Sequence, residues 1–267
     1  MLKLKLLSLK VSLGSYETLL CHIVNLAKQH KPSYVCIANV HSVVEARRNR
    51  SFREALTSAD IVAPDGMPLS RSIKLLHGIK QEPQVATELL NGLFARAEEE
   101  QLPVFFYGGS SEVLKRASDY ITQHYPSLQI AGKYSYPFRS LTEQDKEDIA
   151  NKITKSKAQI VFVVSGVRRQ EKWMYEMRGR IPGVMVGIGD ALPALVGIKK
   201  RAPKWMKNGN MEWAYNMANE PRKIFTSYLA TYAVYTTLVL SEKIRLLMMK
   251  STSTKFTQRE IIEPLVQ

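Results

Sequence analysis

Short apolar runs alternate with longer amphipathic stretches along most of the chain. The short runs, rich in Val, Ile and aromatic residues, predict buried strands. They lie at residues 34–38, 61–63, 103–107, 159–164 and 183–187. Strands separated by helices are joined by right-handed crossovers, which makes the strands parallel and puts helices on both faces. We therefore predict an α/β fold: a doubly wound, mainly parallel sheet followed by a basic helical C-terminal appendage.

Local signals predict how several of these elements begin. Residues 1–10 interleave lysine with leucine, which indicates a strand or an edge hairpin and lacks the unbroken apolar core of a secretory signal. The sequence from Ser51 to Glu54 matches the capping-box motif and predicts the start of a short helix. The acidic pair at Glu143 and Asp145 follows Thr142, so it is better explained by helix capping than by a metal–nucleotide site.

Composition restricts the class of protein. Apolar residues make up 45% and charged residues 23% of the 267 positions, as in an ordinary globular protein. The formal net charge of +14 favours anionic partners such as a nucleotide diphosphate, nucleic acid or an anionic lipid surface. Cys21 and Cys36 are the only cysteines, which is typical of a reduced cytoplasmic protein and signals no disulfide framework or metal site.

Half of the excess positive charge lies between residues 196 and 250. Within this segment, residues 224–240 carry no charge and are rich in Tyr, Leu and Val. A membrane-crossing helix needs about 20 apolar residues, and this stretch is shorter and interrupted by hydroxyl side chains. Two interpretations remain: a helix lying in the headgroup layer of a membrane, and a helix packed on the core or on a second subunit.

The ends of the predicted strands are where chemistry is expected, because open parallel sheets bind ligands beyond the carboxyl ends of their strands. Asp65 follows one such strand, between Pro64 and Gly66. A carboxylate held there and partly desolvated is suited to act as a general base. The alternative is that this tripeptide is only an ordinary turn.

Other strand ends carry further candidates. Asn39 can orient a hydroxyl group of a substrate, and His41 can titrate near neutral pH, although a single histidine is more often structural. Gly108 and Gly109 precede a helix and can offer backbone N–H groups to a phosphate. The pair Gly187 and Gly189 is too short for a dinucleotide fingerprint.

Two basic segments, 201–206 and 220–223, could neutralise a diphosphate leaving group and so remove the need for a divalent cation. Alternatively, they form a solvated basic surface. Trp173, Trp205 and Trp213 are expected to pack, since an isolated aromatic residue usually belongs to a core.

Several segments together resemble the WecG/TagA/CpsF family of bacterial glycosyltransferases. They occur in the family's order over residues 10 to 228, roughly, and are far more specific together than singly. They are Asn39, residues 51–66, Tyr107-Gly-Gly109, Gln170-Glu-Lys-Trp173, Arg201-Ala-Pro-Lys-Trp205, Glu212-Trp213 and Glu220-Pro-Arg222.

The resemblance implies an inverting, metal-independent transferase without a cofactor, located in the cytoplasm at the inner face of the membrane. It would move a sugar from a UDP-sugar to a polyprenyl-diphosphate-linked acceptor for exopolysaccharide, capsule or teichoic acid. Asp65 would be the base, with Asn39 and His41 beside it. The substrate-binding residues would be Gly108, Gly109, Gln170, Glu171, Asp190, Arg201 and Arg222, the two arginines stabilising the departing diphosphate.

The sequence also departs from the family pattern. Many members have Thr where Ile37 stands, Gly-x-Pro where residues 166–169 read Gly-Val-Arg-Arg, Phe-Asp at Leu192-Pro193, and Arg at Asn216. These changes concern the identity of the substrate more than the class of reaction. The sequences at 39–41 and 65–68 resemble the exopolysaccharide glucosyltransferase branch of the family more than its N-acetylmannosaminyltransferase branch.

Two domains are expected: an α/β nucleotide-sugar-binding unit at 1–198 and a basic appendage at 199–267 that meets acceptor and membrane. The partners would be the UDP-sugar, the lipid-linked acceptor and an anionic membrane surface. No nucleic acid is expected, and a homo-oligomer is left open. The competing hypotheses are a non-catalytic basic module that binds anionic membrane or nucleic acid, and an inactive homologue.

Overall fold

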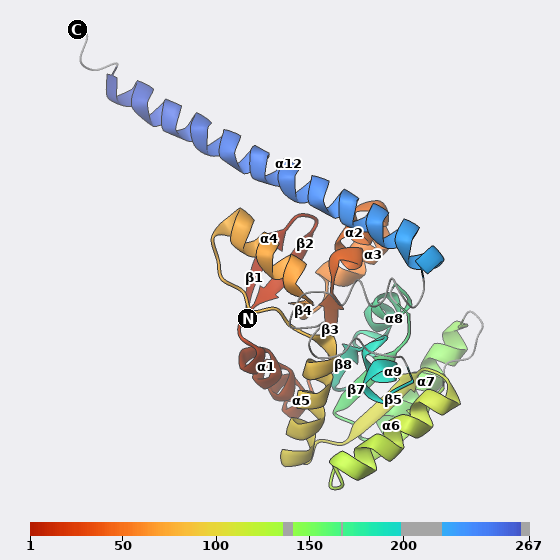
Figure 1. The fold of residues 1–267 in the computed structure, drawn as a ribbon. Coiled ribbons are helices and arrows are strands. Elements are labelled where there is room, and N and C mark those ends of the chain that lie inside the picture. Colours follow the sequence, from red (N-terminus) through yellow and green to blue (C-terminus); the bar gives the residue numbers. More distant parts are fainter. Residues whose placement is uncertain (136–140, 167, 199–220, 263–267) are drawn as a thin grey trace.

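The computed structural model describes residues 1–135, 141–166, 168–198 and 221–262, and the side chains of 229–249 in the last of these segments. Within the described residues, six parallel strands form one sheet in the order β4-β3-β8-β7-β5-β6. Their bounds are β3 Ser33–Ala38, β4 Ile61–Pro64, β5 Val104–Gly108, β6 Ile130–Tyr134, β7 Ile160–Val164 and β8 Val184–Gly187. The predicted α/β fold with a parallel sheet is confirmed (Figure 1).

Helices cover both faces of the sheet because successive strand side chains point to opposite sides. In β7, Ile160 and Phe162 pack with α1 Tyr16–Lys28, α5 Ala86–Glu99, α6 Ser111–His124 and α9 Ala191–Leu195. Val161 and Val163 belong to the other layer. That layer holds α2 Val40–Arg48, α3 Arg50–Thr57, α4 Met67–His77, α7 Glu143–Lys155, α8 Arg169–Met177 and α12 Pro221–Ile262.

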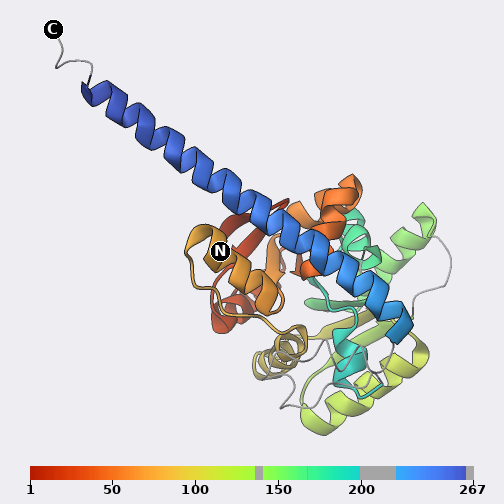
Figure 2. The same ribbon diagram turned by 45° about the horizontal axis from the view of Figure 1, so that its top comes forward.

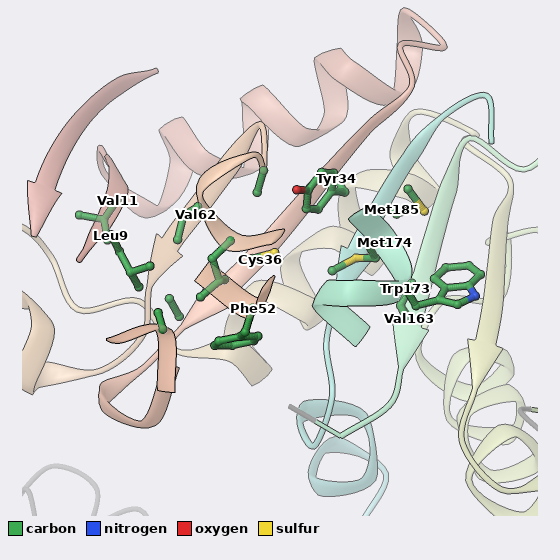
Figure 3. Close-up of a cluster of buried hydrophobic side chains, with 14 of the residues drawn as sticks. Leu9, Val11, Tyr34, Cys36, Phe52, Val62, Val163, Trp173, Met174 and Met185 are labelled. Carbon is green, nitrogen blue, oxygen red and sulfur yellow. The ribbon is translucent and has the colours of Figure 1, made fainter. Parts of the chain in front are cut away.

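The core on the second face joins the sheet to α3 and α8. Figure 3 shows Phe52 of α3 beside Cys36 of β3, and Trp173 and Met174 of α8 next to Val163 of β7. The Trp173 ring stacks on Tyr107, with 3.9 Å between the ring centroids and 13° between their planes. The prediction that Trp173 packs is therefore confirmed, while Trp205 and Trp213 lie outside the described residues.

The predicted N-terminal hairpin is present as β1 Leu2–Leu6 paired antiparallel with β2 Leu9–Leu13. It lies against β4, at the edge of the main sheet. The Val62 backbone N–H donates to the Ser12 hydroxyl at 3.1 Å, so a side chain of the hairpin satisfies a polar group of the edge strand. The hairpin thus covers an edge that would otherwise be open to pairing with another chain.

One predicted cap is wrong. Helix α3 begins at Arg50 rather than after Ser51, and its N-cap is Asn49, whose side chain accepts from the Phe52 N–H at 3.1 Å. Ser51 lies inside the first turn and donates its hydroxyl to Asn49. The predicted capping box is not formed because Asn49, an equally good capping residue two positions earlier, begins the helix. The capping of α7 by Thr142 and Asp145 is confirmed.

Helix α12 crosses α2 and α4 and continues beyond the rest of the molecule (Figures 1 and 2). Tyr235 and Val239 are buried in the core, and the Tyr235 hydroxyl donates to Ser72 Oγ of α4 at 2.7 Å. Lys243 Nζ donates to the Leu75 carbonyl at 2.7 Å. One face of the segment therefore packs on the core, which was one of the two interpretations of residues 224–240. Among helices of the described residues, none is long and apolar enough to cross a membrane.

Candidate active site

The carboxyl ends of the strands bring the candidate residues to one edge of the sheet. Asp65 follows β4 and Asn39 follows the adjacent β3, and the Asp65 N–H donates to the Ala38 carbonyl at 2.8 Å. Asp190 lies beyond β8, which is the next strand, and Gly108 ends β5, two strands further along. Because neighbouring strands are about 4.8 Å apart, Asp65 and Asn39 are close enough to act on one substrate.

Asp65 is held by groups on both sides of its backbone and by its own carboxylate. It forms an isolated parallel bridge with Gln84, whose carbonyl accepts from the Gly66 N–H at 2.8 Å. The Asp65 carboxylate accepts from the N–H of Ala86 at 3.3 Å. Ala86 opens α5, so the carboxylate satisfies one of the backbone donors that a helix start leaves without an intrahelical partner. The side chain remains partly exposed, as a base that meets a substrate must be.

Asn39 caps α2 with one end of its side-chain amide. Its Oδ1 accepts from the Ser42 N–H at 3.2 Å, and its backbone N–H donates to Ser42 Oγ at 3.3 Å, which completes a capping box. This arrangement orients the amide and leaves its NH₂ group as the donor that can meet a ligand. His41, two residues further on, is exposed in the first turn of α2.

The turn after β5 is shaped for close backbone packing. Gly108 has φ +96°, and a Cβ atom built there would lie 2.3 Å from the Val164 carbonyl oxygen of β7. Gly109 follows with φ +71°, and Ser110 then caps α6 by accepting from the Val113 N–H at 3.3 Å. The predicted strand, glycine turn and helix are confirmed, and phosphate binding by this turn stays a prediction.

Gln170 and Glu171 are buried at the start of α8, with 4% and 1% of their surface exposed. Both Glu171 oxygens accept hydrogen bonds, one from Gln170 Nε2 at 2.9 Å and the other from the Arg168 N–H at 2.7 Å. Burial raises the pKa of Glu171, against the lowering effect of these two hydrogen bonds and of one from its own backbone N–H. Asp190 is exposed and stands at the N-cap position of the short helix α9, without a side-chain capping hydrogen bond.

Gln84 is a residue of this region that the sequence did not single out. It is 2% exposed, and its Oε1 has no hydrogen-bond partner among the residues that the structure describes. It lies next to Asp65 only because the chain returns to β4 after α4, in a segment without regular structure. No local pattern around Gln84 carries that information.

Two of the predicted residues cannot be placed. Arg201 lies outside the described residues, and the side chain of Arg222 lies outside them although its backbone belongs to α12. Within the described ranges, no group of three or more His, Cys, Asp or Glu side chains is positioned to hold a metal ion.

Comparison with known proteins agrees with the motifs. Residues 4–248 match the family described as "Glycosyl transferase WecG/TagA/CpsF family". An N-acetylglucosaminyldiphosphoundecaprenol N-acetyl-beta-D-mannosaminyltransferase of Bacillus spizizenii is 30% identical over 196 residues, 73% of this chain and 74% of the relative. A protein of the same name from Bacillus subtilis is 28% identical over 188 residues, 70% of this chain and 72% of the relative. Both relatives are named as N-acetylmannosaminyltransferases, whereas the sequences at 39–41 and 65–68 favoured the glucosyltransferase branch.

Proposed function

The chain belongs to the WecG/TagA/CpsF family of glycosyltransferases, and from this premise we propose that it moves a sugar from a UDP-sugar to a polyprenyl-diphosphate-linked acceptor in the synthesis of a cell-surface polysaccharide. The names of the two relatives support UDP-N-acetylmannosamine as donor and N-acetylglucosaminyl-diphosphoundecaprenol as acceptor. UDP-glucose is the second donor, because the sequence around Asn39 and Asp65 favoured it.

The observation that carries this proposal is the position of Asp65 beside the end of β3. Its carboxylate is anchored by the Ala86 N–H and is partly exposed, next to the strand end that presents the Asn39 amide. Asp65 would take the proton from the attacking hydroxyl of the acceptor. The acceptor oxygen would then bond to the anomeric carbon while the bond from that carbon to the UDP oxygen breaks. UDP leaves with the electron pair, and the configuration at the anomeric carbon inverts.

Charge on the departing diphosphate has to be balanced. Arg201 and Arg222 are proposed for this role, together with the backbone N–H groups of the turn at Gly108 and Gly109. Guanidinium groups bind phosphate oxygens in a bidentate manner and carry their charge at all physiological pH values. The proposed transfer therefore uses basic side chains in place of a divalent cation.

A panel of UDP-sugars tests the proposal directly. We expect transfer to a lipid-linked N-acetylglucosaminyl acceptor with UDP-N-acetylmannosamine and slower transfer with UDP-glucose, measured by chromatography of the lipid product. Faster transfer with UDP-glucose would support the branch indicated by residues 39–41. Absence of product with every UDP-sugar, from a folded protein that binds UDP, would instead support an inactive homologue.

The second face of α12 supports peripheral association with an anionic membrane at the inner face of the cell membrane. Leu240, Ile244 and Leu247 recur at helical spacing and are more than half exposed. Arg48 of α2 and Lys74 of α4 are exposed on the helices that α12 contacts. Apolar side chains flanked by basic residues are the features by which a helix binds the headgroup layer.

Replacing Leu240, Ile244 and Leu247 together by Gln is expected to weaken binding to phosphatidylglycerol vesicles at least about tenfold, since each buried CH₂ contributes about 0.8 kcal/mol. Vesicle sedimentation measures this. Point changes are preferable to truncation because Tyr235 and Val239 belong to the core. A matched control is Tyr175→Gln, which alters an exposed aromatic residue of α8. Equal binding by the triple variant and the wild type would contradict the interfacial role.

A further inference from the structure

The Gln170 side chain is held in one orientation by Glu171. A carboxylate has only acceptors to offer, and both Glu171 oxygens already accept, from Gln170 Nε2 and from the Arg168 N–H. The Gln170 amide must therefore turn its NH₂ group toward Glu171. Its Oε1 consequently points the other way, as a fixed hydrogen-bond acceptor.

The loop before α8 is built to keep this arrangement. Arg168 has φ +77°, which is uncommon for a residue with a side chain and strains the backbone. This backbone conformation accompanies the donation of the Arg168 N–H to Glu171. The Arg168 guanidinium is in turn bound to Glu45 of α2 at 3.2 Å. The carboxylate is thus fixed from the loop, and the loop is fixed from a neighbouring helix.

The acceptor that results has no partner among the described residues. Gln170 Oε1 is buried and makes no hydrogen bond there. It lies at the end of β8, since a Cβ atom at Gly189 would be 3.3 Å from it and one at Gly187 would be 3.3 Å from the amide carbon. The residue beside Oε1 is Gly189, which carries no side chain. A buried acceptor without a hydrogen bond destabilises the folded protein, so its presence favours a role in binding.

We propose that Glu171 is a positioning residue that fixes Gln170 as a hydrogen-bond acceptor, and that Gln170 thereby selects a hydroxyl or N–H donor of the nucleotide sugar. This inference rests on the proposed function. It places the ligand contact at the end of β8, which lies in the sheet between β3, the strand before Asn39, and β5, the strand that ends in the glycine turn. Two parts of the ligand can supply the donor: the uridine and the transferred sugar. UDP alone and the complete UDP-sugar distinguish them.

Glu171→Gln inverts the polarity of this contact without changing its shape. Glutamine at 171 keeps the Arg168 bond through its oxygen and turns its NH₂ group to Gln170. The Gln170 amide then turns over and presents Nε2 where Oε1 was. A ligand donor would meet another donor, and we expect the affinity for the UDP-sugar to fall about tenfold to a hundredfold by isothermal titration calorimetry.

The pH dependence of stability reports the burial of the Glu171 carboxyl group and checks that the variant is folded. Because burial raises the pKa of Glu171, its favourable contribution to folding is complete below the ordinary carboxyl pKa and is lost as the pH rises through the raised value. Glutamine is neutral throughout, so the melting temperature of Glu171→Gln should rise relative to that of the wild type as pH increases.

The experiment uses the full chain with Glu171→Gln, Gln170→Met, which keeps volume but removes the acceptor, and the double variant. Glu147→Gln and Gln144→Met are matched controls at exposed positions of α7. We expect both single variants to bind the ligand more weakly and the double variant to bind no more weakly than Gln170→Met alone. If UDP alone shows the loss, the uridine supplies the donor; if only the UDP-sugar does, the transferred sugar supplies it.

Wild-type affinity in Glu171→Gln, or additive losses in the double variant, would overturn the inference while leaving the proposed function intact. A wild-type protein that binds no UDP-sugar would overturn the proposed function itself. The two failures are therefore distinguishable in the same titrations.

Discussion

Asp65→Asn is expected to lower the rate of sugar transfer by about 10²- to 10⁴-fold while the affinity for the UDP-sugar stays within about twofold. The amide keeps the size of the carboxylate and can still accept from the Ala86 N–H, so the fold and the binding edge remain. It cannot take a proton from the acceptor hydroxyl, and a positioned general base contributes an acceleration of that order. Single-turnover transfer to a lipid-linked acceptor measures the chemical step.

Glu82→Gln is the matched control for this variant. Glu82 is exposed on the segment that leads to Gln84, and its carboxylate interacts with the Tyr16 N–H at 3.4 Å at the start of α1. Removing that negative charge should leave transfer unchanged. Undiminished transfer by a folded Asp65→Asn protein would show that the base is another residue.

Gly108→Ala is expected to destabilise the protein by about 2–5 kcal/mol and to abolish UDP binding at ordinary concentrations. The added Cβ would lie 2.3 Å from the Val164 carbonyl oxygen, which is backbone and cannot turn aside. A side chain at φ +96° is strained as well. The turn can relax only by separating β5 from β7, and this would displace the backbone N–H groups proposed to bind phosphate. Urea unfolding gives the stability change.

Gly166→Ala tests whether this effect comes from close approach rather than from the loss of any glycine at the edge of the sheet. Among the residues that the structure describes, none would lie within 4 Å of a Cβ atom at Gly166, and the φ of Gly166 is not in the positive region. Its unfolding midpoint should match that of the wild type. If Gly108→Ala also unfolded like the wild type, the packing argument for this turn would be wrong.

Periodicity was enough to predict the buried strands, because β3, β5, β7 and β8 are continuous apolar runs. Strand β6 was missed for the opposite reason. Its sequence Ile-Ala-Gly-Lys-Tyr is only partly buried, since β6 is at the edge of the sheet, and Gly132 interrupts it where a Cβ would lie 2.5 Å from the Phe105 ring. An edge strand that packs against one neighbour needs no strong apolar signal.

The site was predictable where strand ends fix it. Asp65 and Asn39 lie together because β4 and β3 are neighbours in a parallel sheet, and a strand–turn–helix pattern suffices to place each of them. Gln84 and the Gln170–Glu171 pair depend on packing between distant segments. Which end of the Gln170 amide faces Glu171 depends on the hydrogen bond between Arg168 and Glu171 in the folded protein. The pattern of apolar and polar residues along the chain does not predict it.

Helix α12 illustrates a sequence pattern that is compatible with two interpretations. Its uncharged stretch was compatible with the core and with a membrane surface, because apolar periodicity does not identify the partner. The structure buries Tyr235 and Val239 against α2 and α4 and leaves Leu240 and Ile244 exposed on a different face. The core interpretation is confirmed for one face of the helix, and membrane binding by the other face stays a prediction, which the vesicle experiment tests.

The central claim is that Asp65 deprotonates the acceptor in a single displacement at the end of β4. Nuclear magnetic resonance of the newly formed glycosidic linkage tests it most directly, through the anomeric configuration of the transferred sugar. We predict the configuration opposite to that of the UDP-sugar. A product that keeps the donor's configuration would contradict it.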